Sequence, residues 1–198
     1  MTNKLVLLND PHFIIDMMYA YPQNMFGRAV YEEMGFGKQA YLHKDALNAL
    51  LRAIPFLEEN KLKMRICDAY RPPKAHRYML QLIPTPGFLA QTPERSNHCH
   101  GTAVDVCLTD LDGRNLIYPT AVDAYDKYFQ EQVCQGHFDS FKQHLQKARH
   151  DYKNAKPDEL HNRQQLKELM ESIGFEAIPH EWWHYNLKGW QTYPMIEG

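Results

Sequence analysis

The chain has 198 residues, a formal net charge of −2 and an apolar fraction of 44%. This length suffices for one domain with a substantial core, and we expect residues 1–198 to form a single domain. The near-neutral charge provides no broad basic face, which argues against nucleic acid as a partner. No stretch approaches the roughly 20 apolar residues of a membrane helix. The first apolar run covers only residues 5–8, too short for a signal-peptide core, so we expect a cytoplasmic protein without a membrane partner.

The cysteines are not arranged in any C-x-x-C pair. Without an export signal, they are interpreted as free thiols rather than as disulfides. The four residues concerned are Cys67, Cys99, Cys107 and Cys134.

The first half of the chain predicts a helix, a strand and a second helix. Apolar residues recur at helical spacing over residues 43–60, and Pro55 is expected to kink this helix. Residues 62–68 alternate between apolar and basic side chains, which predicts a strand whose inward face includes Asp68. Pro73 can then open a helix that runs to about Ile83.

The second half predicts two further strands and a long helix. Residues 102–108 are valines and small side chains followed by a turn, which indicates a strand. Residues 158–172 predict a helix that Gly174 terminates, and residues 182–187 predict the last strand. The polar stretch 133–156 is compatible with a helix. Without regular βαβ alternation, we expect an α+β fold: a small, mainly antiparallel central sheet flanked by helices.

The first segment whose side chains could carry a chemical function is residues 96–105, SNHCHGTAVD. On the predicted strand, Asp105 shares a face with the small side chains of Ala103 and Cys107. Aspartate is disfavoured inside strands, and a lone buried charge is costly. Asp105 therefore needs a partner, either a metal cation or an arginine.

The second segment is residues 180–185, HEWWHY. Glu181 and His184 are three residues apart, which would place them on one face of a helix but on opposite faces of an ideal strand. The aromatic run and Pro179 favour a strand, with Glu181 in the loop before it. Two histidines and one carboxylate form a recurrent catalytic zinc set, and a nearby glutamate that is not a ligand can deprotonate the zinc-bound water.

The third segment is residues 68–72, DAYRP. Arg71 emerges where a strand ends and keeps its charge permanently, so it can hold an oxyanion. The alternative is a purely structural ion pair between Asp68 and Arg71.

Together these segments resemble the D-alanyl-D-alanine dipeptidases, a family of zinc peptidases. The family pattern S-x-H-x-x-G-x-A-x-D is matched by Ser96, His98, Gly101, Ala103 and Asp105. The patterns E-x-W-H-Y and D-x-Y-R-P are matched by Glu181, Trp183, His184 and Tyr185, and by Asp68, Tyr70, Arg71 and Pro72. A weaker match near the N-terminus consists of Tyr19-Ala20, Asn24-Met25 and Gly27. The similarity covers nearly the whole chain.

The resemblance implies roles for these residues. It makes His98, Asp105 and His184 the ligands of one zinc ion, Glu181 the catalytic base and Arg71 the group that stabilises the oxyanion. It implies that an aspartate binds the free amino group of the substrate. The corresponding residue is Asp123, although the family's Phe-Asp pair is Val122-Asp123 here, and the segment 125–159 looks longer than usual.

The reaction implied is hydrolysis of D-Ala-D-Ala to two D-alanines. In this interpretation Ser96 lies close enough to the ligands to bind the substrate carboxylate. The remaining candidates for the substrate pocket are Tyr19, Tyr31, Asp68 and Trp182. For the three aromatic residues among them, packing in the core is an equal alternative.

Three other interpretations remain open. A D,D-carboxypeptidase or cell-wall endopeptidase would keep the metal and act on longer peptides, but such enzymes normally need export. A non-catalytic zinc-binding module, as in hedgehog-type signalling domains, would need neither Glu181 nor Arg71. The ligand set could also hold ferrous iron. The sequence does not determine the oligomeric state.

Overall fold

A computed structural model describes residues 5–83, 89–123 and 139–197 of the chain. It contains a five-stranded sheet with the strand order β2-β4-β5-β7-β6 and a separate two-stranded sheet, β1-β3. The five strands of the main sheet are β2 (Phe13–Ile15), β4 (Lys63–Asp68), β5 (Ala103–Thr109), β7 (Glu181–Leu187) and β6 (Phe175–Ile178). Only the β2–β4 pair is parallel. The predicted α+β fold with a mainly antiparallel central sheet is confirmed.

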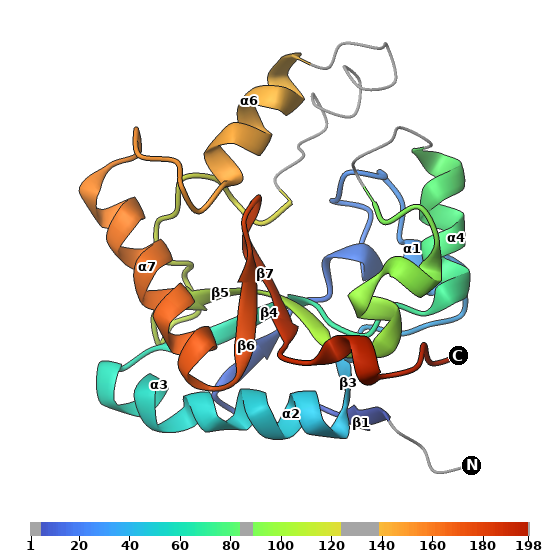
Figure 1. The fold of residues 1–198 in the computed structure, drawn as a ribbon, viewed down its shortest axis with the longest axis horizontal. Coiled ribbons are helices and arrows are strands. Elements are labelled where there is room, and N and C mark those ends of the chain that lie inside the picture. Colours follow the sequence, from blue (N-terminus) through green and yellow to red (C-terminus); the bar gives the residue numbers. More distant parts are fainter. Residues whose placement is uncertain (1–4, 84–88, 124–138, 198) are drawn as a thin grey trace.

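Helices surround this sheet (Figure 1). In that view α7 (Pro157–Ser172) lies on the left, α2 (Lys44–Leu50) and α3 (Ile54–Asn60) lie along the bottom, and α1 (Val30–Glu33) and α4 (Pro73–Leu82) lie on the right. The remaining elements are β1 (Leu5–Leu7), β3 (Tyr41–His43), α6 (Asp139–Ala148) and the 3-10 turns η1 (Met18–Ala20), η2 (Leu51–Ala53), η3 (Pro93–Arg95), η4 (Asn97–His100) and η5 (Trp190–Thr192).

The core fills the space between the sheet and its helices. Alternate residues of β5 point toward it, and they pack with the buried aromatic side chains of β7 and with α7. The members of β5 on this face are Val104, Val106 and Leu108, and all three are fully buried. Because β5 is covered on both faces, its opposite face must also find partners for its polar side chain, Asp105.

The predicted elements are observed with two changes. The single kinked helix expected over residues 43–60 is two helices, α2 and α3, joined by the 3-10 turn η2. The break occurs where Pro55 sits in the first turn of α3, because proline lacks the N–H that would continue the helix from α2. The last strand begins one residue earlier than expected, so that Glu181 belongs to β7 rather than to the preceding loop.

Two further expectations concern cysteines and membranes. Cys67, Cys99 and Cys107 are free thiols as predicted, while Cys134 lies outside the described residues. Within the described part of the chain, every helix is too short or too polar to cross a bilayer.

Candidate metal centre

Strand pairing brings two of the predicted ligands together. β5 and β7 run antiparallel with Asp105 directly opposite His184. Side chains that face each other across a strand pair lie within contact distance. The two residues therefore meet although 79 positions separate them in the sequence.

His98 reaches the same place from η4, the turn that precedes β5. Gly101 ends this turn with a φ of +68°, a left-handed conformation that L side chains rarely adopt. A Cβ at this position would lie 2.9 Å from the backbone nitrogen of His43. Only glycine fits here, and the resulting sharp turn places the His98 ring beside Asp105.

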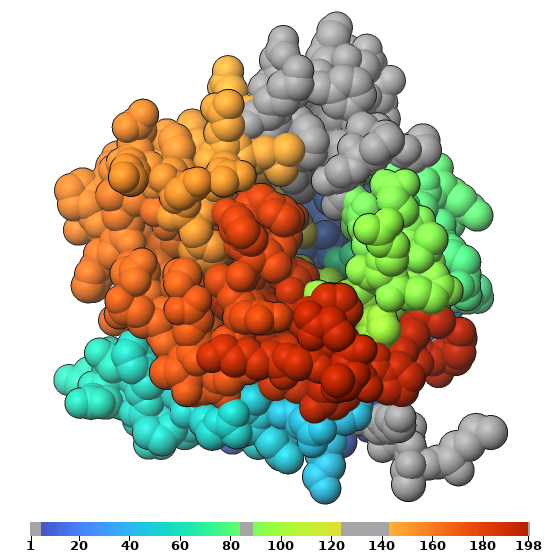
Figure 2. All heavy atoms as spheres, viewed as in Figure 1, coloured from blue at the N-terminus to red at the C-terminus, as the bar shows by residue number. Residues whose placement is uncertain are grey.

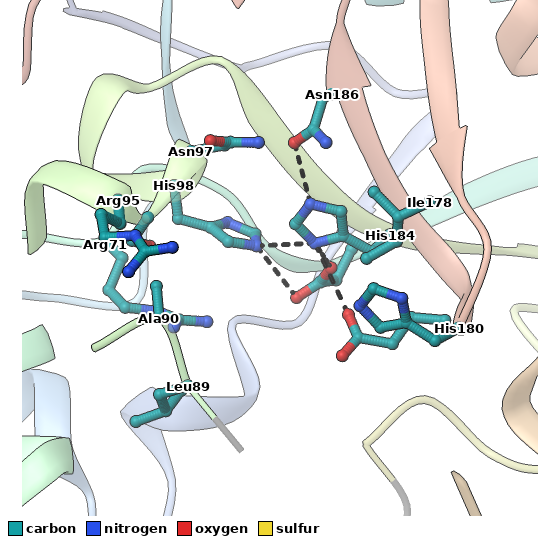
Figure 3. A pocket seen from close by; sticks show the side chains of 13 residues that line it. Arg71, Leu89, Ala90, Arg95, Asn97, His98, Ile178, His180, His184 and Asn186 are labelled. Carbon is teal, nitrogen blue, oxygen red and sulfur yellow. Dashed lines mark hydrogen bonds and ion pairs between the residues drawn. The ribbon is translucent and has the colours of Figure 1, made fainter. Parts of the chain in front are cut away.

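The three donor groups face one another within a few ångströms (Figure 3). His98 Nε2 lies 3.2 Å from His184 Nδ1. Asp105 approaches both rings, with Oδ1 3.0 Å from His184 Nδ1 and Oδ2 3.3 Å from His98 Nε2. Three donors about 2.0–2.2 Å from a tetrahedral zinc ion lie roughly 3.3 Å from one another, so the observed spacing fits such an ion.

The second nitrogen of each ring is already engaged. His98 Nδ1 donates to the carbonyl oxygen of Ala69 at 2.7 Å. His184 Nε2 donates to Asn186 Oδ1 at 2.9 Å. These contacts leave the lone pairs of His98 Nε2 and His184 Nδ1 facing each other beside a carboxylate. A cation between them relieves this repulsion, and the donor set of two imidazoles and one carboxylate suits zinc.

The electrostatics of the group favour a positive charge. Burial lowers the pKa of His98, but Asp105 and Asp68 outweigh this effect and raise the pKa above its ordinary value. Burial raises the pKa of Asp105, but His98 and His184 hold it well below its usual range. Asp105 is therefore a carboxylate at neutral pH, and its negative charge is available to a metal ion.

Glu181 lies at the edge of this group, with Oε2 3.9 Å from His184 Nδ1. An ideal strand would point the two side chains to opposite faces, but the pairing of β6 with β7 shifts between Ala177↔Tyr185 and Ile178↔Glu181. This irregularity in β7 allows Glu181 and His184 to approach each other. Burial raises the pKa of Glu181 to about 8, and a dication at the neighbouring ligands would lower it.

Arg71 forms a buried ion pair with Asp68. The guanidinium donates through Nε and Nη2 to Asp68 Oδ2 at 3.1 and 2.8 Å. The hydroxyl of Tyr31 donates to Asp68 Oδ1 at 2.5 Å. Burial, followed by the charge of Asp68, raises the pKa of Tyr31 well above its ordinary value, which keeps it a neutral donor. The expected inward position of Asp68 is confirmed.

Asp123 takes part in a neighbouring contact. It accepts a 2.5 Å hydrogen bond from the hydroxyl of Tyr19, whose ring lies beneath the Arg71 guanidinium at 5.2 Å. Its φ of +36° is unusual for a residue with a side chain. Burial raises the pKa of Asp123 to about 6, and the charge of Asp105 adds to this shift.

His98, Asp105 and His184, called the metal group below, line a cavity of about 470 Å³. Figure 2 shows the surface hollowed between the green residues near 89–98 and the orange and red residues of β6 and β7. Among the predicted site residues, those that line this cavity are Arg71, Ser96, His98, Asp105, Glu181 and His184. The others, Tyr19, Tyr31, Asp68, Asp123 and Trp182, do not line it.

Trp182 instead belongs to the core. It is fully buried, it stacks on Tyr118 with ring centroids 4.0 Å apart, and its indole N–H donates to Thr120 Oγ1 at 2.9 Å. It therefore anchors the segment that leads to Asp123. His100, the other histidine of the first motif, bonds through both ring nitrogens to the carbonyl oxygens of Glu94 and Tyr193.

The cavity-lining residues that the sequence analysis did not predict include two polar side chains, Asn186 and Arg95. Asn186 follows His184 by two positions, so the period of the strand would have placed both on one face. Arg95 directly precedes Ser96, but no motif pointed to it.

Comparisons with known proteins identify related sequences. Residues 129–195 match a family model described as D-ala-D-ala dipeptidase. The chain is 30% identical to the D-alanyl-D-alanine dipeptidase of Escherichia coli K12 over 94% of its own length and 84% of that protein. It is 26% identical to the D-alanyl-D-alanine dipeptidase of Enterococcus faecium, over 74% of this chain and 72% of that one, and 28% identical to that of Enterococcus faecalis, over 78% and 63%. The chain belongs to the D-alanyl-D-alanine dipeptidase family.

Proposed function

We propose that this single-domain chain is a zinc-dependent dipeptidase that hydrolyses D-Ala-D-Ala to two D-alanines. The observation that carries the proposal is the group formed by His98, Asp105 and His184, whose free donor atoms converge beside Glu181 in one cavity. The names of the related proteins support the substrate. Held by these three residues, zinc would polarise the peptide carbonyl and acidify a water molecule.

Glu181 is the general base in this proposal. Its carboxylate lies next to a ligand without belonging to the converging donor set. It accepts the proton of the attacking water and passes it to the amine that leaves when the peptide bond breaks. Burial raises the pKa of this carboxyl group and a bound dication would lower it again, and these opposing effects suit a group that must both accept and release a proton near neutral pH.

Arg71 stabilises the negative charge that develops on the carbonyl oxygen. Asp68 holds its Nε and Nη2, which fixes the guanidinium, while Nη1 forms no hydrogen bond or ion pair with the described residues and the side chain lines the cavity. A donor positioned in advance costs no reorganisation when charge appears in the transition state. Tyr31 and Asp68 are positioning residues for this arginine, because both act through contact with it or its partner.

The substrate's two charged ends need separate partners. Ser96 lines the cavity immediately before the His98 turn and can donate to the substrate carboxylate. Asp123, held by Tyr19, is assigned to the substrate ammonium group. Trp182 supports this assignment indirectly, because it packs against the segment that ends at Asp123.

The decisive test compares substrates on the zinc-loaded protein. We expect D-Ala-D-Ala to be cleaved at least about tenfold faster, in kcat/KM, than N-acetyl-D-Ala-D-Ala or a tripeptide ending in D-Ala-D-Ala. Blocking the amine would leave Asp123 without its partner, and each 1.4 kcal/mol lost corresponds to about a factor of ten. Equal rates would instead favour a D,D-carboxypeptidase and remove the role of Asp123. Stoichiometric zinc without cleavage of any of these peptides would favour a zinc-binding module.

A second test separates the base from the ligands. Glu181→Gln should keep one zinc per chain and lose about 10²–10⁴-fold in kcat. Glu168→Gln, an exposed change of the same type on α7, is the matched control and should retain both. Loss of zinc from Glu181→Gln would make Glu181 a ligand and contradict the assignment.

A further inference from the structure

Arg95 is a cationic side chain at the rim of the metal cavity that lacks an internal partner. It is the last residue of η3, it is exposed, and it lines the cavity. Among the described residues, no hydrogen bond or ion pair involves its guanidinium, and the same is true of only one other arginine, Arg77 on α4. Arg77 does not line the cavity.

The second arginine of the cavity differs in this respect. Arg71 is buried and its charge is balanced by Asp68 at 2.8 Å. Of the cationic side chains that line the cavity as described, Arg95 is therefore the one whose charge is not balanced by a neighbouring carboxylate. Figure 3 shows both arginines on the side of the cavity that carries His98, facing Ile178 and His180 on the other side.

The position of Arg95 along the chain also relates it to the reacting bond. Arg95 and Ser96 directly precede η4, which carries His98. In a dipeptide, the scissile carbonyl and the terminal carboxylate belong to neighbouring residues, whose Cα atoms are about 3.8 Å apart. A peptide whose scissile carbonyl lies at His98, Asp105 and His184 therefore has its carboxylate within one residue of it, and Arg95 lines the same cavity three positions before His98.

We propose that Arg95 binds the terminal carboxylate of the substrate and so selects peptides that end at the residue after the scissile bond. This proposal rests on the proposed dipeptidase function and adds a specificity residue to it. Ser96 alone would supply one neutral hydrogen bond, whereas the planar fork of Arg95 can bind a carboxylate through two charged ones. Together with Asp123 at the ammonium end, it fixes the direction in which the peptide lies across the metal group.

The test uses a substrate pair that differs only in this charge. Wild type, Arg95→Gln, Arg95→Lys and the control Arg77→Gln are assayed, each loaded with zinc, on D-Ala-D-Ala and on its C-terminal amide. We expect Arg95→Gln to lower kcat/KM for D-Ala-D-Ala about tenfold or more, mainly through KM, because the charge-assisted hydrogen bonds to the substrate carboxylate are lost. The amide should be affected less than about twofold, Arg95→Lys should recover part of the loss, and Arg77→Gln should match wild type.

Equal losses on both substrates, or no loss on either, would overturn the proposal. A binding measurement keeps it independent of turnover: affinities for D-Ala-D-Ala and its amide are measured by calorimetry on zinc-loaded Glu181→Gln, with and without Arg95→Gln. We expect Arg95→Gln to weaken binding of the free acid alone. If wild type fails to cleave D-Ala-D-Ala, the dipeptidase function is refuted, and Arg95 is then judged by calorimetry, where absence of this selective weakening refutes its role as well.

Discussion

The site contains two groups of buried charges that are built on opposite principles. In the Asp68–Arg71 pair, every charge has a partner within the protein, and Tyr31 satisfies the remaining carboxylate oxygen. In the group of His98, Asp105 and His184, two lone pairs and a carboxylate converge on one point. The first group is electrically complete, while the second is complete only with a cation. This difference fits the proposed roles, in which the first group orients Arg71 and the second holds a metal.

Removal of a predicted ligand from the group of His98, Asp105 and His184 should give the largest effect. His184→Ala should abolish tight zinc binding and activity together, because only one histidine and one carboxylate remain. Zinc content by elemental analysis checks this result. His180→Ala is the matched control, since His180 lines the same cavity outside the donor set and its loss should leave zinc content unchanged. Full zinc occupancy in His184→Ala would refute the metal assignment.

Breaking the Asp68–Arg71 pair should lower the free energy of unfolding and leave the zinc content unchanged. In Asp68→Asn, the new amide N–H group would face the donors of Arg71, which leaves a buried positive charge without a partner. Loss of one member of a buried pair typically costs 3–5 kcal/mol. Denaturant unfolding should show a loss of about this size in the free energy of unfolding, while zinc stoichiometry stays at one.

The control for this change is Asp16→Asn. Asp16 pairs with Arg65 at 2.6 Å, but its side chain is 45% exposed. Pairs near the surface contribute about 0–1 kcal/mol, so this variant should unfold almost like wild type. If both variants lose the same stability, burial does not distinguish the two pairs and the contrast drawn above fails.

A smaller effect is expected from removing the hydrogen bond between His184 and Asn186. Asn186→Leu removes the acceptor for His184 Nε2 and should weaken zinc binding about 10–100-fold, the usual cost of losing such a contact. Asn186→Asp keeps an acceptor and should retain the affinity. Asn162→Leu, on α7, controls for the loss of an amide elsewhere. Competition with a chelator measures all three, and wild-type affinity in Asn186→Leu would show that His184 is oriented by other contacts.

The last effect concerns the pH dependence of stability. His76 is fully buried on α4, and burial together with the charge of Arg71 lowers its pKa to about 4. The unfolded chain therefore binds a proton more readily, so stability present above pH 6.5 is lost as the pH falls toward 4, by at most about 3 kcal/mol. In metal-free protein, His76→Gln should show a shallower decline over this range. An unchanged slope would place the titrating group elsewhere.

Much of this arrangement followed from local sequence patterns. The alternation of residues 62–68 placed Asp68 inward, and the small residues beside Asp105 predicted a polar partner. The three side chains expected as ligands do converge in space, although binding of a metal to them stays a prediction.

Other features depend on contacts that no local pattern encodes. The approach of Glu181 to His184 requires the register shift between β6 and β7, which only the pairing of two strands defines. The tyrosine at position 19 meets Asp123 across 104 positions, so its hydrogen bond could not be inferred from spacing. Arg95 was not predicted because what distinguishes it is a guanidinium without an ion pair or hydrogen bond to the described residues. That property can be seen only when the neighbouring side chains are known.

The long separation between the donors has a consequence for folding. Asp105 and His184 are 79 positions apart, and they meet only after β5 and β7 have paired. An unfolded chain does not hold them together, so the proposed metal ion would bind the native state selectively and would shift the folding equilibrium by mass action, by about 2.7 kcal/mol at a free metal concentration one hundred times the dissociation constant. If the proposed metal binds, its supply in the surroundings would therefore affect how well the chain resists unfolding and proteolysis, as well as its proposed activity.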